Sequence, residues 1–460
     1  MADDGLRSAL LASIPGDLVT MGSTPPDQAI FHSTVPARVG ASVRAQNVEH
    51  VQAAVRAAGA VDRKVSVLTS GHGLLDDIFG DVALNMSEFD SVSVDAQAQV
   101  ATIGGGARWA SVLAQCAPVG LAPLSGSSPT VGVAGYTTGG GIGLLSRQFG
   151  FCADHVVDVE VVTGAGELLT ASPVENPDLF WAIRGSQSSL GVVTKLRVKL
   201  FPIEKFYGGN LIWPAEWAVE VIPQILDWAQ GIPESMSVSF ALIDFPPIDA
   251  VPALMRGQRM MVARLCTTDE SPASQALLAD LAARTKPIAN TLRWMSLSET
   301  PAIHADPDVR GNYRSWSRGL RRVGDSTMQT VEEWAEGSYR GVGVIEFRLM
   351  GGALSRRPEI ENCVDGRDFP INCFASGDGP PGSADEVDGS VGEIASGTWH
   401  DRADRLLLNF MGGDQLNDVR SAFRTETVNR LVGVIDEYDP ASVMRTVIDF
   451  PPRDESKLLC

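Results

Sequence analysis

Glycine is denser between Gly126 and Gly143 than anywhere else in this chain of 460 residues, in the run GSSPTVGVAGYTTGGGIG. Consecutive backbone N–H groups form good sites for a diphosphate. A flexible linker would be polar and rich in serine, whereas this run interleaves Val131, Val133 and Tyr136 with its glycines. The pattern favours a packed backbone cradle, with glycines that only permit turns as the alternative. By propensity, the run favours neither a helix nor a strand.

A histidine in a turn is the second candidate for chemistry. His72 lies between Gly71 and Gly73, directly after residues 64–68, which read as a buried strand. The flanking glycines let the backbone approach a phosphate group closely. An ordinary turn histidine in contact with solvent is the alternative.

A carboxylate and a guanidinium form the third candidate. Glu346 and Arg348 lie two residues apart in a strand-like segment, so they share one face of the strand with Val344. Ile345 and Phe347 lie on the opposite face. This pair could act on a substrate, or it could be a solvated ion pair on an exposed face.

Two other kinds of site are disfavoured. The segment from Gly141 to Ser146 reads GxGxxS, but serine replaces the third glycine of the dinucleotide motif and no clear strand precedes it. The six cysteines contain no CxxC pair and no metal-like spacing with the six histidines, so no metal site is expected. We expect reduced thiols packed as small hydrophobic groups.

Charge and length bound the remaining options. The 37 basic and 56 acidic residues give a net charge of −19, which repels nucleic acid. No apolar stretch is long enough to span a membrane, and the first residues lack the basic start of a signal peptide, so we expect a cytoplasmic protein. The length predicts two domains.

Elements that position these residues follow from periodicity and turn signals. Near the start, the pattern predicts a helix over 47–59, strands over 92–95 and 99–103, a helix with Trp109 and Cys116 on its apolar face, and strands over 156–163 and 191–200. Helices should open at Pro214 and Pro272 and cover 418–438. Strand-like segments cover 236–242, 259–266, 342–350 and 406–410, and residues 376–392 read as a mobile surface loop.

A long co-linear series of segments carries a family resemblance. It comprises VSVLTSGHG, VATIGGGARWASVL, the run from Gly120 through LTAS, and ENPDLFWAIRGSQSSLGVVTKLRVKLFP. Residues 64–202 thereby resemble the FAD-binding domain of the vanillyl-alcohol oxidase/PCMH superfamily, specifically the bacterial berberine-bridge-enzyme-like oxidases. The resemblance implies an α+β, two-domain PCMH-type FAD-binding fold, whose substrate domain is an antiparallel sheet covered by helices. It implies an FAD-binding domain of two α+β subdomains over 1–204, a substrate domain over 205–414, and a C-terminal return over 415–460.

The resemblance also implies the cofactor and its contacts. FAD would be joined covalently through His72 to the 8α-methyl of its ring, which makes the flavin a stronger oxidant. The residues that would bind it are Ser70, Gly71, His72, Gly73, Leu74, Ser128, Thr130, Val131, Gly132, Gly135, Thr138, Gly139, Gly140, Gly143, Val162, Gly191 and Val193.

Two positions refine this expectation. Many relatives form a second flavin link through a cysteine where this chain has Ser128, whose hydroxyl stays protonated at neutral pH, so we expect a single linkage. Val131 stands where similar enzymes gate oxygen access to the flavin. Valine there favours an oxidase over a dehydrogenase.

The catalytic base is where this chain departs from the family. The usual Tyr-x-Asn string reads Leu407-Leu408-Asn409, so the tyrosine is absent. Glu346 is then the best candidate for the base, with a pKa raised by an apolar flavin and tuned by Arg348. His400, Asp244 and Tyr136 are the reserves. Strings at 185–191 and 444–448 also depart from the family pattern close to the ring.

The resulting functional expectation is an FAD-linked oxidase. It would oxidise a small organic molecule, in secondary metabolism by resemblance only, through hydride transfer to FAD and reoxidation by molecular oxygen. There are two alternatives. The first is a non-redox cyclase that keeps FAD as a structural element, which the absence of the tyrosine suggests. The second is a flavin-bearing binding protein without turnover. The sequence does not identify the substrate or the oligomeric state.

Overall fold

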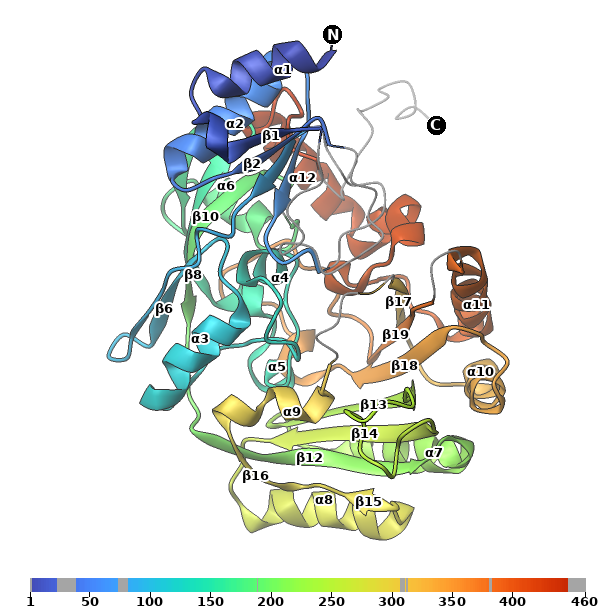
Figure 1. Cartoon of the computed structure of the whole chain (residues 1–460). Helices are drawn as coiled ribbons and strands as arrows, with labels where there is room; N and C mark the ends of the chain where they lie inside the picture. Colours follow the sequence, from blue (N-terminus) through green and yellow to red (C-terminus); the bar gives the residue numbers. More distant parts are fainter. Residues whose placement is uncertain are drawn as a thin grey trace.

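The computed structural model describes residues 2–22, 39–72, 82–187, 189–306, 311, 313–379 and 383–445. Figure 1 shows the N-terminal segments, blue to teal, above a broad green-to-orange sheet. Near the C-terminus, the red helix α12 (Thr425–Tyr438) returns to the upper half. Chain segments that are distant in sequence therefore meet where the two halves face each other.

A small sheet with two helices opens the chain. Its order is β1 (Val19–Met21), β2 (Ala41–Arg44), β4 (Val82–Asn85) and β3 (Val65–Leu68), and the last three strands are parallel. The helices α1 (Ala2–Leu11) and α2 (Val48–Ala60) pack on it through buried side chains such as Leu10 and Val55. Asn47 caps α2 by accepting the N–H of His50 at 2.9 Å, as its sequence position predicts.

A five-stranded antiparallel sheet follows. Its order is β5 (Val92–Asp95), β6 (Val100–Gly104), β10 (Gly191–Lys199), β8 (Val156–Thr163) and β9 (Leu168–Ala171). The core beside it holds α3 (Trp109–Cys116) and α6 (Pro177–Ile183), and Leu431 of α12 joins the same core. A two-stranded pair, β7 (Leu121–Ala122) with β11 (Phe201–Pro202), leads to the next sheet.

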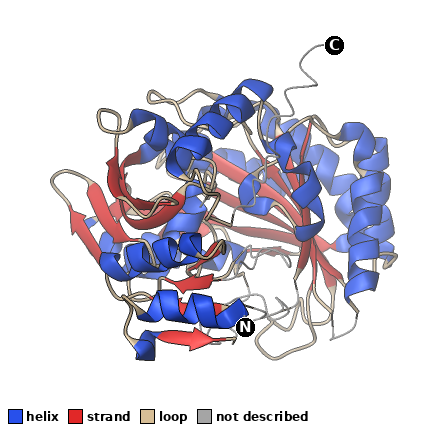
Figure 2. Cartoon of the chain, turned by 90° about the horizontal axis from the view of Figure 1, so that it is seen from above, coloured by secondary structure: helices blue, strands red, loops and turns tan. Residues whose placement is uncertain are grey.

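The largest sheet is antiparallel and has eight strands. Its order is β15 (Ala289–Asn290), β12 (Lys205–Pro214), β14 (Arg259–Thr267), β13 (Met236–Asp244), β18 (Val342–Leu349), β19 (Ile371–Gly377) and β17 (Arg314–Leu320), with β16 (Arg293–Ser296) also paired to β12. Four helices pack on one face, as Figures 1 and 2 show: α7 (Ala218–Trp228), α8 (Pro272–Thr285), α10 (Asp325–Glu336) and α11 (Ala384–Gly397). The other face looks toward the glycine-rich run.

Strand β18 alternates as its sequence predicts. Ile345 and Phe347 are buried in the core under the helices. Glu346 and Arg348 point to the opposite face, where an Arg348 N–H group reaches the carbonyl of Ile142. The two-residue period thus directs both charged side chains toward the other half of the molecule.

Short helices fill the connections. The α-helical ones are α4 (Val133–Thr138), α5 (Ser146–Phe149) and α9 (Pro301–His304). The 3-10 turns are η1 (Gly16–Leu18), η2 (Ala117–Val119), η3 (Cys152–His155), η4 (Ala215–Trp217), η5 (Ala229–Gly231), η6 (Leu297–Glu299), η7 (Gly352–Ser355), η8 (Trp399–Asp401), η9 (Leu408–Phe410) and η10 (Gly413–Ala422).

Three local predictions were wrong. Residues 406–410 contain the 3-10 turn η9 rather than a strand, since their apolar side chains contact cores on different sides. Residues 376–392 include the end of β19 and most of α11, whose Val387 and Val391 pack on the sheet. The glycine-rich run contains helix α4, because tertiary packing of Val133 and Ala134 overrides the low helix propensity of glycine.

The described part of the chain also bears on membranes, metals and thiols. No helix in it has the length and apolarity to cross a membrane. The described residues include no group of three or more side chains suited to hold a metal ion. Cys116, Cys152, Cys266, Cys363 and Cys373 are buried and unpaired, and Cys460 lies outside the described residues. The division of the chain at residues 204 and 414 stays a prediction.

Candidate active site

His72 meets the start of the glycine-rich run. Its Nε2 lies 3.3 Å from Oγ1 of Thr130, which is 2.9 Å from Oγ of Ser128. Its Nδ1 lies 3.2 Å from Oγ of Ser70, and that oxygen also accepts the N–H of Gly132 at 3.0 Å. The turn after β3 and the glycine-rich run are therefore brought together.

Glycine is needed at two points of this contact. Gly71 has φ of +69°, a left-handed conformation that favours glycine. A Cβ on Gly132 would lie 2.5 Å from Oγ1 of Thr69, so any side chain there would separate the run from the turn. Gly73 and Leu74 lie outside the described residues.

Backbone amides in the second half of the glycine-rich run form hydrogen bonds within the protein. The amide of Gly139 donates to the carbonyl of Gly135 and that of Gly140 to Thr137. Gly143 donates to Oγ of Ser146. These three amides are therefore not available to a diphosphate in this structure, and the role of Gly139, Gly140 and Gly143 in binding a cofactor stays a prediction.

Asn409 explains several of these glycines. Its Oδ1 accepts the amide of Gly141 at 2.9 Å, and its Nδ2 donates to the carbonyl of Tyr136 at 3.2 Å. A Cβ on Gly139 would lie 2.7 Å from that Nδ2. Leu407, two residues earlier, is buried among apolar side chains that include Phe151 and Phe369. The position of the family's tyrosine is thus part of a hydrophobic core.

Four charged or titratable side chains meet on the sheet face opposite the helices. Glu346 accepts Nη1 of Arg264 at 3.1 Å on one oxygen and Nη2 of Arg348 at 3.0 Å on the other. Nε2 of His304 lies 3.5 Å from Oε1 of Glu346, and both side chains are at most 7% exposed. We call Arg264, His304, Glu346 and Arg348 the Glu346 cluster.

The burial of Glu346 excludes a solvated ion pair, and the charges around it exclude a raised pKa of its carboxyl group. A solvated Glu–Arg pair is excluded because Glu346 is only 5% exposed. Burial by itself raises the pKa of Glu346, but Arg348, His304 and Arg264 outweigh it and hold the pKa well below its ordinary value. The expectation of a raised pKa was wrong, because a second arginine, Arg264, was not anticipated.

Sequence reasoning missed His304, Arg264 and Ser239. Burial and the charge of Arg264 lower the pKa of His304, so its ring is neutral at pH 7. Ser239 on β13 is opposite Arg348 of β18 and opposite Arg264 of β14. A two-residue period in each strand could have indicated their faces, but only the sheet order brings these strands together.

The three other candidate bases, His400, Asp244 and Tyr136, lie in different surroundings. His400 lies exposed in η8, and Asp244 pairs with Arg259 at the surface. Tyr136 is buried, and its hydroxyl has no hydrogen-bond partner. Burial and the neighbouring Cys152 raise its pKa, against a smaller lowering by Arg348.

The remaining predicted cofactor residues lie in α4, in strands β8 and β10, and at Val131 before α4. Gly135 and Thr138 belong to α4, and the Thr138 hydroxyl donates to the carbonyl of Ala134. Val162 and Gly191 adjoin in β8 and β10, where a Cβ on Gly191 would lie 2.3 Å from the carbonyl oxygen of Val162. Val193 is buried on β10. Val131 is half-buried beside the core of the upper half, and its oxygen-gating role stays a prediction.

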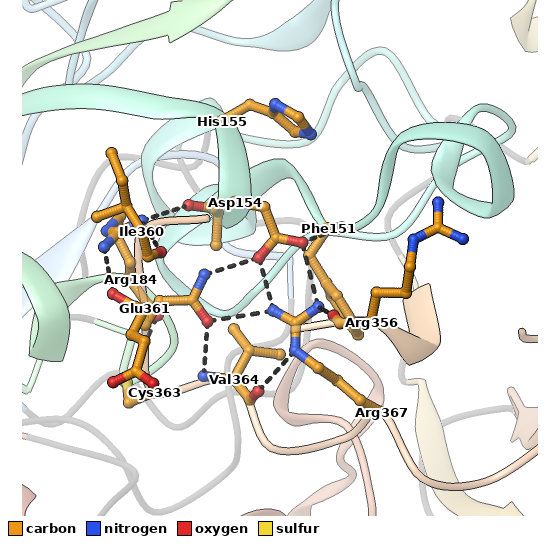
Figure 3. Close-up of polar contacts among 12 residues, drawn as sticks. Phe151, Asp154, His155, Arg184, Arg356, Ile360, Glu361, Cys363, Val364 and Arg367 are labelled. Carbon is orange, nitrogen blue, oxygen red and sulfur yellow. Dashed lines mark hydrogen bonds and ion pairs between the residues drawn. The ribbon is translucent and has the colours of Figure 1, made fainter. Parts of the chain in front are cut away.

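A second buried ionic group includes Arg184, which directly precedes residues 185–191, one of the two strings that depart from the family pattern. Figure 3 shows Asp154 facing Arg367, with Arg184 close by. Asp154 takes Nη2 of Arg367 at 2.6 Å and Nη1 at 3.1 Å, and it also accepts Nδ2 of Asn362. We call Asp154, Arg184, Asn362 and Arg367 the Asp154 cluster.

Comparisons with known proteins give the architecture a context. Residues 39–172 match the FAD binding domain family. Xylooligosaccharide oxidase of Thermothelomyces thermophilus is 33% identical over 223 residues, which cover 46% of this chain and 45% of that protein. Among solved structures, a Phl p 4 variant described as a glucose oxidase superposes with a TM-score of 0.84 at 20% identity, covering 98% of this chain and 99% of the other. Physcomitrella patens BBE-like 1 gives a TM-score of 0.81 at 18% identity, covering 97% and 99%.

The chain has the two-domain PCMH-type fold. The predicted fold class is confirmed, and the FAD-binding match supports the superfamily named from the sequence. The sequence match spans less than half the length of the xylooligosaccharide oxidase. The bacterial subfamily stays a prediction.

The residues present fit an FAD on the PCMH-type fold at the ring end. His72 is half-buried beside Thr130 and Ser128, which leaves an imidazole nitrogen near the run. Gly135 is exposed although its neighbours in α4 are buried, and a Cβ there would meet no atom within 4 Å. A helix that turns a bare glycine to open space can be approached closely by a flat ring. His72, Ser70, Thr130 and Gly135 are the described residues best placed to hold it.

Proposed function

We propose that this protein is an FAD-dependent oxidase of a small organic molecule. The observation that carries the proposal is the convergence of His72 with Ser128 and Thr130, within the segment that matches an FAD binding domain. When bound, FAD supplies an acceptor for a hydride and returns the electrons to oxygen. The setting in secondary metabolism rests on resemblance alone.

The chain's own residues have separate roles in this proposal. His72 binds the flavin covalently, and Ser128 leaves the linkage single. Val131 admits oxygen. Glu346 takes a proton from the substrate, and Arg348 orients Glu346 through the 3.0 Å contact.

Two observations keep the non-redox cyclase as an alternative. Leu407 stands in a hydrophobic core where the family has its tyrosine. Both oxygens of Glu346 already bind arginines, which weakens it as a base in the free protein. Anaerobic mixing with substrate separates the alternatives, because only an oxidoreductase bleaches the flavin.

The linkage has a direct test. We expect flavin to stay with the wild-type protein after acid precipitation and to be released from His72→Ala, because the imidazole is the only proposed attachment. His50→Ala, in the first turn of α2, where the side chain is half-buried, is the matched control and should retain the flavin. Flavin released from the wild type, or a cysteinyl flavin found by peptide mapping, would contradict the proposed single histidyl bond.

A further inference from the structure

One cavity lies between the large sheet and the glycine-rich run. Arg264, Ser239 and Arg348 line it from neighbouring strands, and His304 lines it from α9. Ile142 and Leu144 form the opposite wall. Figure 1 shows α9 at this junction, beside β13 and β14. The cavity has a volume of about 20 Å³, on the order of one water molecule, so it can take no more than the polar end of a ligand.

Buried polar atoms without partners gather at this cavity. Nε of Arg264, Oγ of Ser239 and Nδ1 of His304 are buried and make no hydrogen bond, whereas Nε2 of His304 lies 3.5 Å from Glu346. Buried polar groups in folded proteins are almost always hydrogen-bonded. Three such side chains on the wall of one cavity indicate donors that a ligand satisfies.

The charge of the cavity gives the sign of that ligand. Arg147, Arg264 and Arg348 line the cavity with three positive charges, the adjoining Glu346 contributes one negative charge, and the His304 ring is neutral. The sum, 3 − 1 = +2, is an excess of positive charge at the site. Buried charges are costly unless they are paired. A negatively charged ligand would reduce this excess.

We propose that this cavity recognises a carboxylate on the substrate, through Arg264 together with Ser239 and His304. The assignment of the ligand as the substrate rests on the proposed oxidase function. Arginine suits a carboxylate because its planar fork can donate two parallel hydrogen bonds. The small volume places only the carboxylate inside, so the oxidised part of the molecule lies outside the cavity.

Glu346 competes with such a ligand. It occupies one donor of each arginine, so a second carboxylate must share them. An added negative charge beside Glu346 raises the pKa of its carboxyl group. Carboxylate binding would therefore make Glu346 a stronger base only when the substrate is present.

The test uses the flavin-containing protein with benzoate and its neutral analogue benzamide. Calorimetric titration should show benzoate binding and no measurable benzamide binding. Arg264→Gln should weaken benzoate binding by about tenfold to a hundredfold, the usual effect of losing a charged hydrogen bond. Glu346→Gln should strengthen it, because the competing carboxylate is gone. Arg318→Gln is the matched control, since Arg318 is a buried arginine of the same sheet that pairs with Asp418 outside the cavity lining, and it should leave the affinity unchanged.

Several outcomes would overturn the proposal. Equal binding of benzoate and benzamide, no benzoate binding at all, or equal effects of Arg264→Gln and Arg318→Gln would each do so. If Arg264→Gln does not fold, Ser239→Ala should still weaken benzoate binding severalfold, and an unchanged affinity would count against the site. Benzoate binding needs no turnover. A protein that binds benzoate but never reduces its flavin would contradict the oxidase and leave the carboxylate site standing.

Discussion

The Asp154 cluster and the Glu346 cluster are both buried ionic groups, but only one is complete. Arg367 donates to Asp154, Asn362 and two carbonyls, and Arg184 donates to the carbonyls of Phe180, Ala153, Ile360 and Glu361. Figure 3 shows Arg367 in contact with Asp154 and Arg184 beside Ile360 and Glu361. In the Glu346 cluster, by contrast, Nε of Arg264 and Nδ1 of His304 remain without partners.

The difference separates a structural role from a functional one. A fully paired buried group has no donor left for a ligand, so the Asp154 cluster joins the segment before β8 to the loop near Arg367. An incompletely paired group is unfavourable in the free protein and is expected at functional sites. Buried charge alone would not distinguish the two.

The largest effect that we expect from a substitution in either cluster is a loss of folding stability. Asp154→Asn should lower the free energy of unfolding by about 3–5 kcal/mol, because it leaves the guanidinium of Arg367 buried without its counter-ion. Denaturant titration measures this change. Asp158→Asn is the control, since Asp158 pairs with Arg197 at the surface, and it should cost no more than about 1 kcal/mol. A benzoate affinity that falls in Asp154→Asn as it does in Arg264→Gln would show that the two clusters act as one.

The next largest effect is expected on the rate of flavin reduction. Glu346→Gln should slow anaerobic flavin reduction by about a hundredfold, the usual contribution of a positioned base. Because the same change removes a competitor of the substrate carboxylate, KM should fall together with kcat. Stopped-flow reduction of the flavin gives both quantities. Glu234→Gln, at an exposed pair with Arg356, is the control. Normal reduction together with lowered stability would make Glu346 a structural partner of the two arginines.

The smallest effect is a pH dependence of stability that His304 contributes. Arg264, Glu346 and Asp306 face this ring, and the net result with burial is a pKa below the ordinary 6.5. Below pH 6.5 the unfolded state therefore binds a proton that the folded state does not, so stability falls as the pH falls, by at most about 1.4 kcal/mol per pH unit. His304→Gln should lose less stability than the wild type between neutral and mildly acidic pH. Identical pH profiles would mean that folding does not change the pKa of His304 and would contradict this prediction.

Local patterns predicted the elements of this protein well where neighbours in sequence are neighbours in space. Asn47 caps its helix, and the pair of strands β5 and β6 forms as expected, because both depend on contacts within a few residues. The two-residue period also placed Glu346 and Arg348 on one face. The helix inside the glycine-rich run was missed because packing, rather than propensity, stabilises it.

The sequence by itself determined the turn around His72, the glycine-rich run that meets it, and the direction of the Glu346 and Arg348 side chains. Only the tertiary structure decided how these parts are used. Asn409 reaches Gly141 across 268 residues, and Arg264 reaches Glu346 across 82. Contacts of this range depend on the order and register of strands in the large sheet, which no local period encodes. For that reason the incomplete pairing of the Glu346 cluster is a property of the folded chain alone.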